Sequence, residues 1–111
     1  MKIERQQVGT VEVCTPVGPL VDEDAAQFAR ELRERLKTAN PRLVLALHEV
    51  PYLDSAALEG LLDAADELGT RAQQLKIARV TPTCREVFEL VGLSGRFQFF
   101  DDVQYAVRSF L

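Results

Sequence analysis

An uninterrupted apolar run in the middle of the chain places the strongest constraint on the fold. Residues 43–47 read Leu-Val-Leu-Ala-Leu, without a single polar residue. A strand with one face in water alternates apolar and polar residues, whereas a strand covered on both faces loses that alternation. Leu43 to Leu47 are therefore predicted to form an inner strand of a sheet.

A helix with a polar start is predicted directly after this strand. Its apolar residues recur at spacings of three and four and are Leu58, Leu61, Leu62, Ala65 and Leu68, with Gly69 as the predicted C-cap. Asp54 and Ser55 precede them, and both residue types cap helices by accepting hydrogen bonds from free amides of the first turn. Those amides and the helix dipole also favour negative charge. Ser55 therefore has two interpretations: a capping serine, or a hydroxyl at a position where a phosphate is tolerated.

Strand and helix patterns alternate through the rest of the chain. The other predicted strands are 3–7, 10–15 (broken by Pro16 and joined to the first at Val8-Gly9), 75–80, and 97–100 as a short strand or extended segment. The predicted starts of the other helices are Asp22 or Asp24, Thr81 followed by Pro82, and Asp101 or Asp102. The first of these helices is predicted to end at Asn40-Pro41 and the second at Gly92-Leu93.

Each of these helices has an apolar stripe that is expected to face the core. The stripes are Ala25, Phe28, Ala29, Leu32 and Leu36 in the first, Val87, Leu90 and Val91 in the second, and Val103, Ala106, Val107 and Phe110 in the third. Two strands followed by alternating helices and strands predict a mixed sheet with right-handed crossovers between parallel strands. We therefore expect one α/β domain over residues 1–111, a sandwich of four or five strands and about four helices.

Composition and charge argue against several classes of function. The net charge of −4 disfavours a nucleic-acid partner, because neutralising phosphates requires a basic face. The densest basic segment also carries acidic residues and is predicted to be a solvated helix face: Arg30, Glu31, Arg33, Glu34, Arg35 and Lys37. No apolar run approaches the ~20 residues of a membrane span, and the first residues lack the apolar region of a signal peptide. A cytoplasmic protein without membrane insertion is expected.

The sequence offers little for catalysis, metal binding or a cofactor. Cys14 and Cys84 have no metal-ligand spacing, and His48 is the only histidine. Cys14 is expected in the core, whereas Cys84 lies in the first turn of a predicted helix, a position that can lower the pKa of a thiol. We expect no catalytic residue, no metal and no cofactor. A small enzyme that uses Cys84, His48 or the carboxylates is the competing interpretation.

The element order, together with Asp54-Ser55-Ala56-Ala57-Leu58, resembles the STAS domain family, whose best-known members are bacterial anti-sigma factor antagonists. Two further segments match. Gly18-Pro19-Leu20 lies where the family has a glycine, a variable residue and a leucine between its second strand and first helix. Residues 88–93 resemble the family's late helix, in which an aromatic residue precedes a Gly-Leu turn. The resemblance covers essentially the whole chain and implies a STAS-like α/β sandwich.

The resemblance also implies a function. In such antagonists the hydroxyl residue after the aspartate is phosphorylated by a serine kinase that is also the anti-sigma factor. The unphosphorylated antagonist binds and sequesters this partner. A serine phosphatase removes the phosphate and so restores the unphosphorylated antagonist. Ser55 is then the phosphoacceptor, and the residues expected in the partner-binding surface are Asp54, Ser55, Ala56, Glu59, Asp22 and Asp24. The alternative is a STAS interaction subunit of a sensor or transporter assembly that works without phosphorylation.

Two positions depart from the family pattern. Ala56-Ala57 stands where the family often has serine or threonine followed by glycine, and Glu59 stands where the family residue is usually small. Since a helix brings residues i and i+4 together, the Glu59 carboxylate is predicted to lie near any phosphate on Ser55. At ~6 Å and an effective dielectric constant near 20, the repulsion approaches about 3 kcal/mol per unit charge before salt screening. This repulsion opposes phosphorylation and leaves the fold unaffected.

Overall fold

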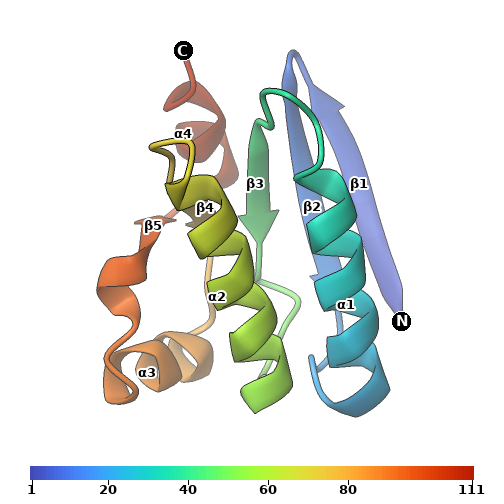
Figure 1. Ribbon diagram of the computed structural model, residues 1–111. Helices are drawn as coiled ribbons and strands as arrows, with labels where there is room; N and C mark the ends of the chain where they lie inside the picture. The colour runs from blue at the N-terminus through green and yellow to red at the C-terminus, as the bar shows by residue number, and fades with distance from the viewer.

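A mixed five-stranded sheet forms the middle of the computed structural model, which describes residues 1–111 (Figure 1). The strands lie side by side in chain order: β1 (Lys2–Val8), β2 (Val11–Val17), β3 (Leu43–Ala46), β4 (Leu75–Ala78) and β5 (Phe97–Phe100). β1 and β2 are antiparallel, and every later neighbour pair is parallel. The predicted mixed sheet is confirmed, with β3 as its middle strand.

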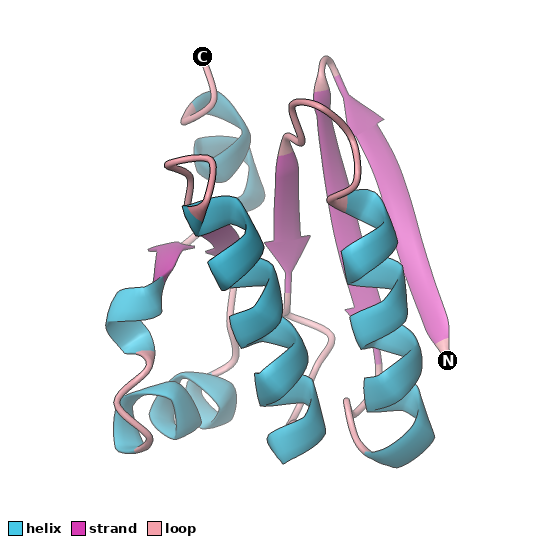
Figure 2. Cartoon of the chain, viewed as in Figure 1, coloured by secondary structure: helices cyan, strands magenta, loops and turns pink.

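Helices cover both faces of this sheet (Figure 2). They are α1 (Asp22–Arg35), α2 (Ser55–Gly69), α3 (Pro82–Leu90) and α4 (Val103–Arg108), with a single 3-10 turn, η1 (Ser94–Arg96). α1 and α2 lie side by side on one face, α4 lies on the other, and α3 lies at the end of the sheet where α1 and α2 begin (Figure 1). The helices are all too short or too polar to traverse a lipid bilayer.

The residues of β3 explain why its sequence has no polar alternation. Leu43 and Leu45 belong to the larger core beneath α1 and α2, whereas Val44 and Ala46 belong to the smaller core beneath α4. All four side chains are buried. Successive residues of a strand point to opposite faces, so a strand between two cores must be apolar throughout.

The two helices on the larger core meet closely at one glycine. A Cβ atom added to Gly60 of α2 would lie 2.8 Å from the Cβ atom of Ala29 of α1. Non-bonded carbons are separated by about 3.5–4 Å at their optimum, so any larger residue at position 60 would force the helices apart. The sequence interpretation missed this contact.

Several predicted boundaries are wrong by a few residues. The first turn is Gly9-Thr10, with Gly9 at φ +60°. β2 continues through Pro16, because its pairing with β3 ends at Cys14 and the missing proline N–H lies beyond that ladder. β4 ends at Ala78, since Arg79 adopts a left-handed conformation (φ +56°).

The ends of the first two helices also differ from the prediction. α1 stops at Arg35, ahead of Asn40-Pro41. α2 includes Gly69, and Thr70 is its C-cap. The left-handed residue that redirects the chain after α2 is Ala72, at φ +58°, so Gly69 is not needed for the turn.

The predicted inward face of α3 is largely wrong. Leu90 and Val91 are 77% and 51% exposed, whereas Cys84 and Phe88 are fully buried. The Phe88 ring packs against the ring of Phe97, with their centroids 5.5 Å apart, and this contact fixes which side of the helix faces the core.

The predicted caps of the last two helices are confirmed. Thr81 Oγ1 accepts a hydrogen bond from the backbone amide of Cys84, and Pro82 follows at the first helical position. Gly92 has the positive φ (+73°) of a C-terminal glycine. Of the two candidate caps for α4, Asp102 is the one that accepts, from the amide of Tyr105 at 2.7 Å.

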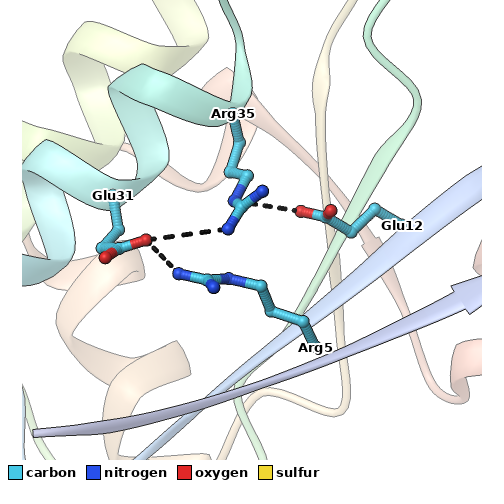
Figure 3. A network of polar contacts seen from close by, with 4 residues as sticks. All are labelled: Arg5, Glu12, Glu31 and Arg35. Atoms are coloured by element: carbon cyan, nitrogen blue, oxygen red, sulfur yellow. Dashed lines mark hydrogen bonds and ion pairs between the residues drawn. The ribbon is translucent and has the colours of Figure 1, made fainter.

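The charged segment of α1 is only partly a solvated face. Glu31 pairs with Arg5 of β1, and Arg35 Nη2 lies 3.9 Å from the same Glu31 oxygen (Figure 3). Arg35 Nε also lies 3.4 Å from Glu12 Oε1 on β2. These four side chains are each between a quarter and two-fifths exposed. They join α1 to both N-terminal strands.

Candidate functional site

Ser55 is the first residue of α2, and its side chain is exposed. The capping interpretation of this serine is wrong, because the N-cap is Asp54, whose Oδ1 accepts from the amide of Ala57 at 3.0 Å. The Ser55 hydroxyl takes part in none of the side-chain hydrogen bonds of the chain. A free hydroxyl therefore stands at a helix N-terminus, where the dipole and the amides of the first turn favour negative charge.

The Asp54 carboxylate holds a second amide as well. Its Oδ2 accepts a hydrogen bond from the backbone N–H of Asp22 at 2.8 Å. Hydrogen bonds from the amides of Asp22 and then Ala57 lower the pKa of Asp54, because they stabilise the ionised carboxylate. One side chain thus joins the starts of α1 and α2.

Backbone hydrogen bonds reinforce this junction along the two loops that lead into α1 and α2. The amide of Leu20 donates to the carbonyl of Tyr52 at 3.1 Å, and the amide of Asp54 donates to the carbonyl of Leu20 at 3.0 Å. The Gly18 amide donates to the Glu49 carbonyl at 2.9 Å. The two loops therefore form one continuous surface at the end of the sheet where α1 and α2 begin (Figure 1).

Neither predicted cap of α1 is correct. The N-cap residue is Val21, whose side chain cannot accept a hydrogen bond, so α1 has no side-chain N-cap of its own. Asp22 has a left-handed backbone (φ +52°), a conformation that aspartate tolerates better than most residues. Its amide is taken by Asp54, and the Asp24 carboxylate lies 3.5 Å from the amino nitrogen of Met1.

The predicted surface residues gather at this end of the molecule, and their charges are of one sign. Ala56 and Glu59 are exposed beside Ser55 on α2. The two loops and the helix starts (residues 18–24 and 48–60) contain no lysine or arginine. Their acidic residues are Asp22, Glu23, Asp24, Glu49, Asp54 and Glu59. A surface of this kind is electrostatically suited to a basic partner.

The sequence interpretation missed two features of this surface. Tyr52 is 52% exposed, three residues before Ser55, and exposed tyrosines are frequent anchors of protein interfaces. The other feature is a contact between the start of α3 and the loop that leads into α2. Thr81 Oγ1 and Cys84 Sγ both donate to the carbonyl of Val50 in this loop, at 3.0 and 3.5 Å. A long-range contact between a side chain and a carbonyl leaves no signal in a single sequence.

The residues proposed for a competing enzyme have other surroundings. Cys84 is buried, and this burial raises the pKa of its thiol instead of lowering it. Burial also raises the pKa of Cys14 to about 11. His48 is half-buried at the start of the loop between β3 and α2. Both thiols are held in the protonated, weakly nucleophilic form.

Comparison with known proteins gives a coherent result. A model of the STAS domain matches residues 2–106. BtrV of Bordetella bronchiseptica, a relative named as an anti-sigma factor antagonist, is 26% identical over 110 residues, which are 99% of this chain and 95% of BtrV.

Solved structures extend the similarity at the level of the fold. An anti-sigma factor antagonist from Mycobacterium paratuberculosis superposes with a TM-score of 0.82 and 21% identity, over 97% of this chain and 92% of that one. SpoIIAA of Bacillus in its phosphorylated form gives a TM-score of 0.73 and 17% identity, over 99% of this chain and 100% of SpoIIAA. Its unphosphorylated form also gives 0.73.

Proposed function

The chain belongs to the STAS domain family, and from this premise we propose that it is an anti-sigma factor antagonist switched by phosphorylation of Ser55. Unphosphorylated, it binds and sequesters an anti-sigma factor that is also a serine kinase; a serine phosphatase removes the phosphate. The supporting observation is the free, exposed hydroxyl of Ser55. This hydroxyl is not needed to cap α2, because Asp54 is the N-cap. The chain acts here as substrate and ligand, so the switch requires no catalytic residue from it.

The site is suited to receive a phosphate. Asp54 accepts from the amide of Ala57, and the first amides of a helix have no carbonyl partner within the helix itself. A phosphate on Ser55 would gain from these amides and from the dipole of α2. The kinase reaches the hydroxyl without any local unfolding, because the side chain is already exposed.

The effect of the phosphate on binding follows from charge and solvation. An interface built around the neutral Ser55 hydroxyl, with Asp22, Asp54 and Glu59 near it, already carries a high density of negative charge. Phosphorylation adds about −1.5 to −2 charges at its centre. Burying that group without dedicated partner cations costs desolvation energy, so the complex dissociates.

The predicted partner-binding residues have distinct functions in this proposal. Asp54 orients the two loops, and Ser55 and Ala56 form the centre of contact. Asp22, Asp24 and Glu59 supply negative charge toward a basic patch of the anti-sigma factor. Tyr52 adds an aromatic side chain at the edge of the same surface.

The test combines a phosphorylation assay with a binding assay. The protein is incubated with its cognate anti-sigma kinase and ATP, and the modified residue is located by mass spectrometry. We expect one phosphate, on Ser55, and none on S55A. Calorimetry should show that S55A binds the kinase as tightly as the unmodified protein, whereas the phosphorylated protein and S55D bind at least tenfold more weakly.

A second function is favoured by one specific feature, the exposed Glu59 one helical turn beyond Ser55. Its repulsion of a phosphate suits an interaction subunit of a sensor or transporter assembly that works without phosphorylation. The two functions separate in the same experiment. Phosphorylation of another residue, or a complex that forms while Ser55 is never modified, supports the interaction subunit that works without phosphorylation.

A further inference from the structure

A polar pocket lies at the opposite end of the sheet from Ser55. It has a volume of about 370 Å³ and is bounded by the segments that lead into β3 and β4 and by the end of α4. Since β3 and β4 are parallel, they start at the same end of the sheet, and α2, which begins with Ser55, starts at the opposite end (Figure 1). The polar side chains that line the pocket, apart from Ser109, are Asn40, Arg42, Gln73, Gln74, Lys76 and Gln98.

The charge of this pocket differs from that of the chain as a whole. The chain has a net charge of −4, yet no aspartate or glutamate lines the pocket, which holds Arg42 and Lys76. Neither cation forms a salt bridge, whereas Arg5, Arg35 and Arg71 all pair with glutamates. Arg42 also lines a neighbouring hollow with Glu12, Glu31 and Glu34, but it forms a salt bridge with none of them. Two positive charges without a salt-bridge partner in one concave site attract anions.

The pocket also has hydrogen-bond donors to spare. Arg42 uses one N–H, on Thr10 Oγ1 at 2.9 Å, and Lys76 uses one, on Ser109 Oγ at 2.6 Å. A guanidinium has five N–H donors and an ammonium three, so most remain free. The side-chain amides of Asn40, Gln73, Gln74 and Gln98 take part in none of the hydrogen bonds within the chain.

Lys76 is held in place before any ligand arrives. Its Nζ lies 4.0 Å from the centroid of the Phe110 ring, in addition to its hydrogen bond with Ser109. Partial burial lowers the pKa of Lys76, because the charged ammonium has lost water without gaining a carboxylate. A cation that is already ordered and partly desolvated loses little entropy on binding an anion.

We propose that this pocket binds a small phosphate-bearing anion, either inorganic phosphate or the terminal group of a phosphate monoester. Phosphate carries up to two negative charges at neutral pH, which match Arg42 and Lys76. It also presents at least three acceptor oxygens to the free donors, whereas a carboxylate presents two. The site lies at the opposite end of the sheet from Ser55, so this proposal does not rest on the antagonist function.

The experiment is a titration of the full chain with inorganic phosphate at constant ionic strength, followed by calorimetry and by amide NMR shifts. Glycerol phosphate and acetate serve as the second and third ligands. We expect saturable phosphate binding with shifts at Gln74, Lys76 and Gln98, and little response to acetate. K76M and R42Q should each weaken binding roughly tenfold, the usual effect of losing a hydrogen bond to a charged group.

The matched control is K2M, which removes the same charge from an exposed β1 side chain outside the pocket. K2M should bind phosphate like the wild type, and melting curves without ligand establish that each variant is folded. Tighter binding of glycerol phosphate identifies a monoester as the ligand, and tighter binding of phosphate identifies the free ion. Non-saturating binding, equal losses in K2M and K76M, or acetate binding as well as phosphate would each overturn the proposal.

Discussion

The backbone amide of Asp22 donates a hydrogen bond to Asp54 Oδ2 at 2.8 Å, across thirty-two positions of sequence. The other oxygen of the same carboxylate caps α2. The position of the β2–α1 loop is therefore tied to the residue that immediately precedes Ser55. Any partner that contacts Ser55 meets this loop in a fixed place.

Replacing Asp54 with alanine should loosen both helix starts at once. Without the carboxylate, the amides of Asp22 and Ala57 lose their acceptor, so their hydrogen exchange should accelerate together and the melting temperature should fall. S55A is the matched control, because the Ser55 hydroxyl that it removes accepts a hydrogen bond from neither amide. Unchanged protection of Asp22 in D54A would show that the backbone bonds alone hold the loop.

The depressed pKa of Asp54 gives the contribution of this carboxylate a defined pH dependence. A carboxylate whose folded-state pKa is lower than its unfolded value stabilises the fold fully above the unfolded value, about 3.9. The contribution disappears as the pH falls through the folded-state pKa. Urea midpoints of the wild type and D54N should therefore differ at pH 7 and converge below about pH 4. A constant difference down to pH 2 would contradict the proposed hydrogen bonding.

Gly60 and Gly69 provide a paired test of helix packing. G60A places a methyl group 2.8 Å from the Ala29 Cβ and should destabilise the fold by roughly 1–3 kcal/mol, the usual range for overpacking. A Cβ on Gly69 meets nothing within 4 Å, so G69A should be neutral or stabilise α2 by up to about 1 kcal/mol. Chemical denaturation measures both. Equal effects of the two changes would rule out a close approach of α1 and α2.

Glu59 should slow the phosphorylation of Ser55 by its charge. E59Q removes a carboxylate one helical turn from the hydroxyl, so the initial rate with the cognate kinase should rise several-fold. D63N is the control, since Asp63 lies eight residues from Ser55, about 12 Å along the helix and beyond the ~10 Å Debye length at 0.1 M salt. The gain in E59Q should shrink as salt is added. A gain that is equally large in D63N would point to the net charge of the protein instead.

Asp22 should contribute to partner binding through charge alone. Asparagine tolerates the same left-handed backbone, so D22N preserves the loop while removing one negative charge. The association rate with the anti-sigma factor should fall a few-fold, with a weaker dependence on salt. D63N, an exposed change eight residues beyond Ser55 on α2, removes the same charge away from this end of the sheet and is the control. Equal effects of both variants would argue that the β2–α1 loop lies outside the interface.

Features with a local cause could be predicted from the sequence. The inner strand follows from an apolar run, and the helix start at Ser55 follows from a polar pair before an apolar period. The caps at Thr81 and Asp102 follow from residue type. These signals lie within a few residues of what they determine.

Features with a distant cause could not be predicted. The sequence favours Asp22 or Asp24 as the cap of α1, because nothing in it shows that the Asp22 amide donates to Asp54. In α3, apolar residues lie on more than one side, and packing against the distant rings of Phe97 and Phe99 turns Phe88 inward while Leu90 faces water. Gly60 has no special backbone angle, so its importance depends entirely on Ala29 of the neighbouring helix.

The division of β3 between two cores has a consequence for how this fold can change over evolutionary time. A substitution at Leu45 must fit the core beneath α1 and α2. A substitution at Val44 must fit the core beneath α4, although the two residues are adjacent in the chain. Substitutions that repack the core beneath α1 and α2 therefore need no compensation in the core beneath α4. The two faces can diverge at different rates, with the sheet as the partition between them.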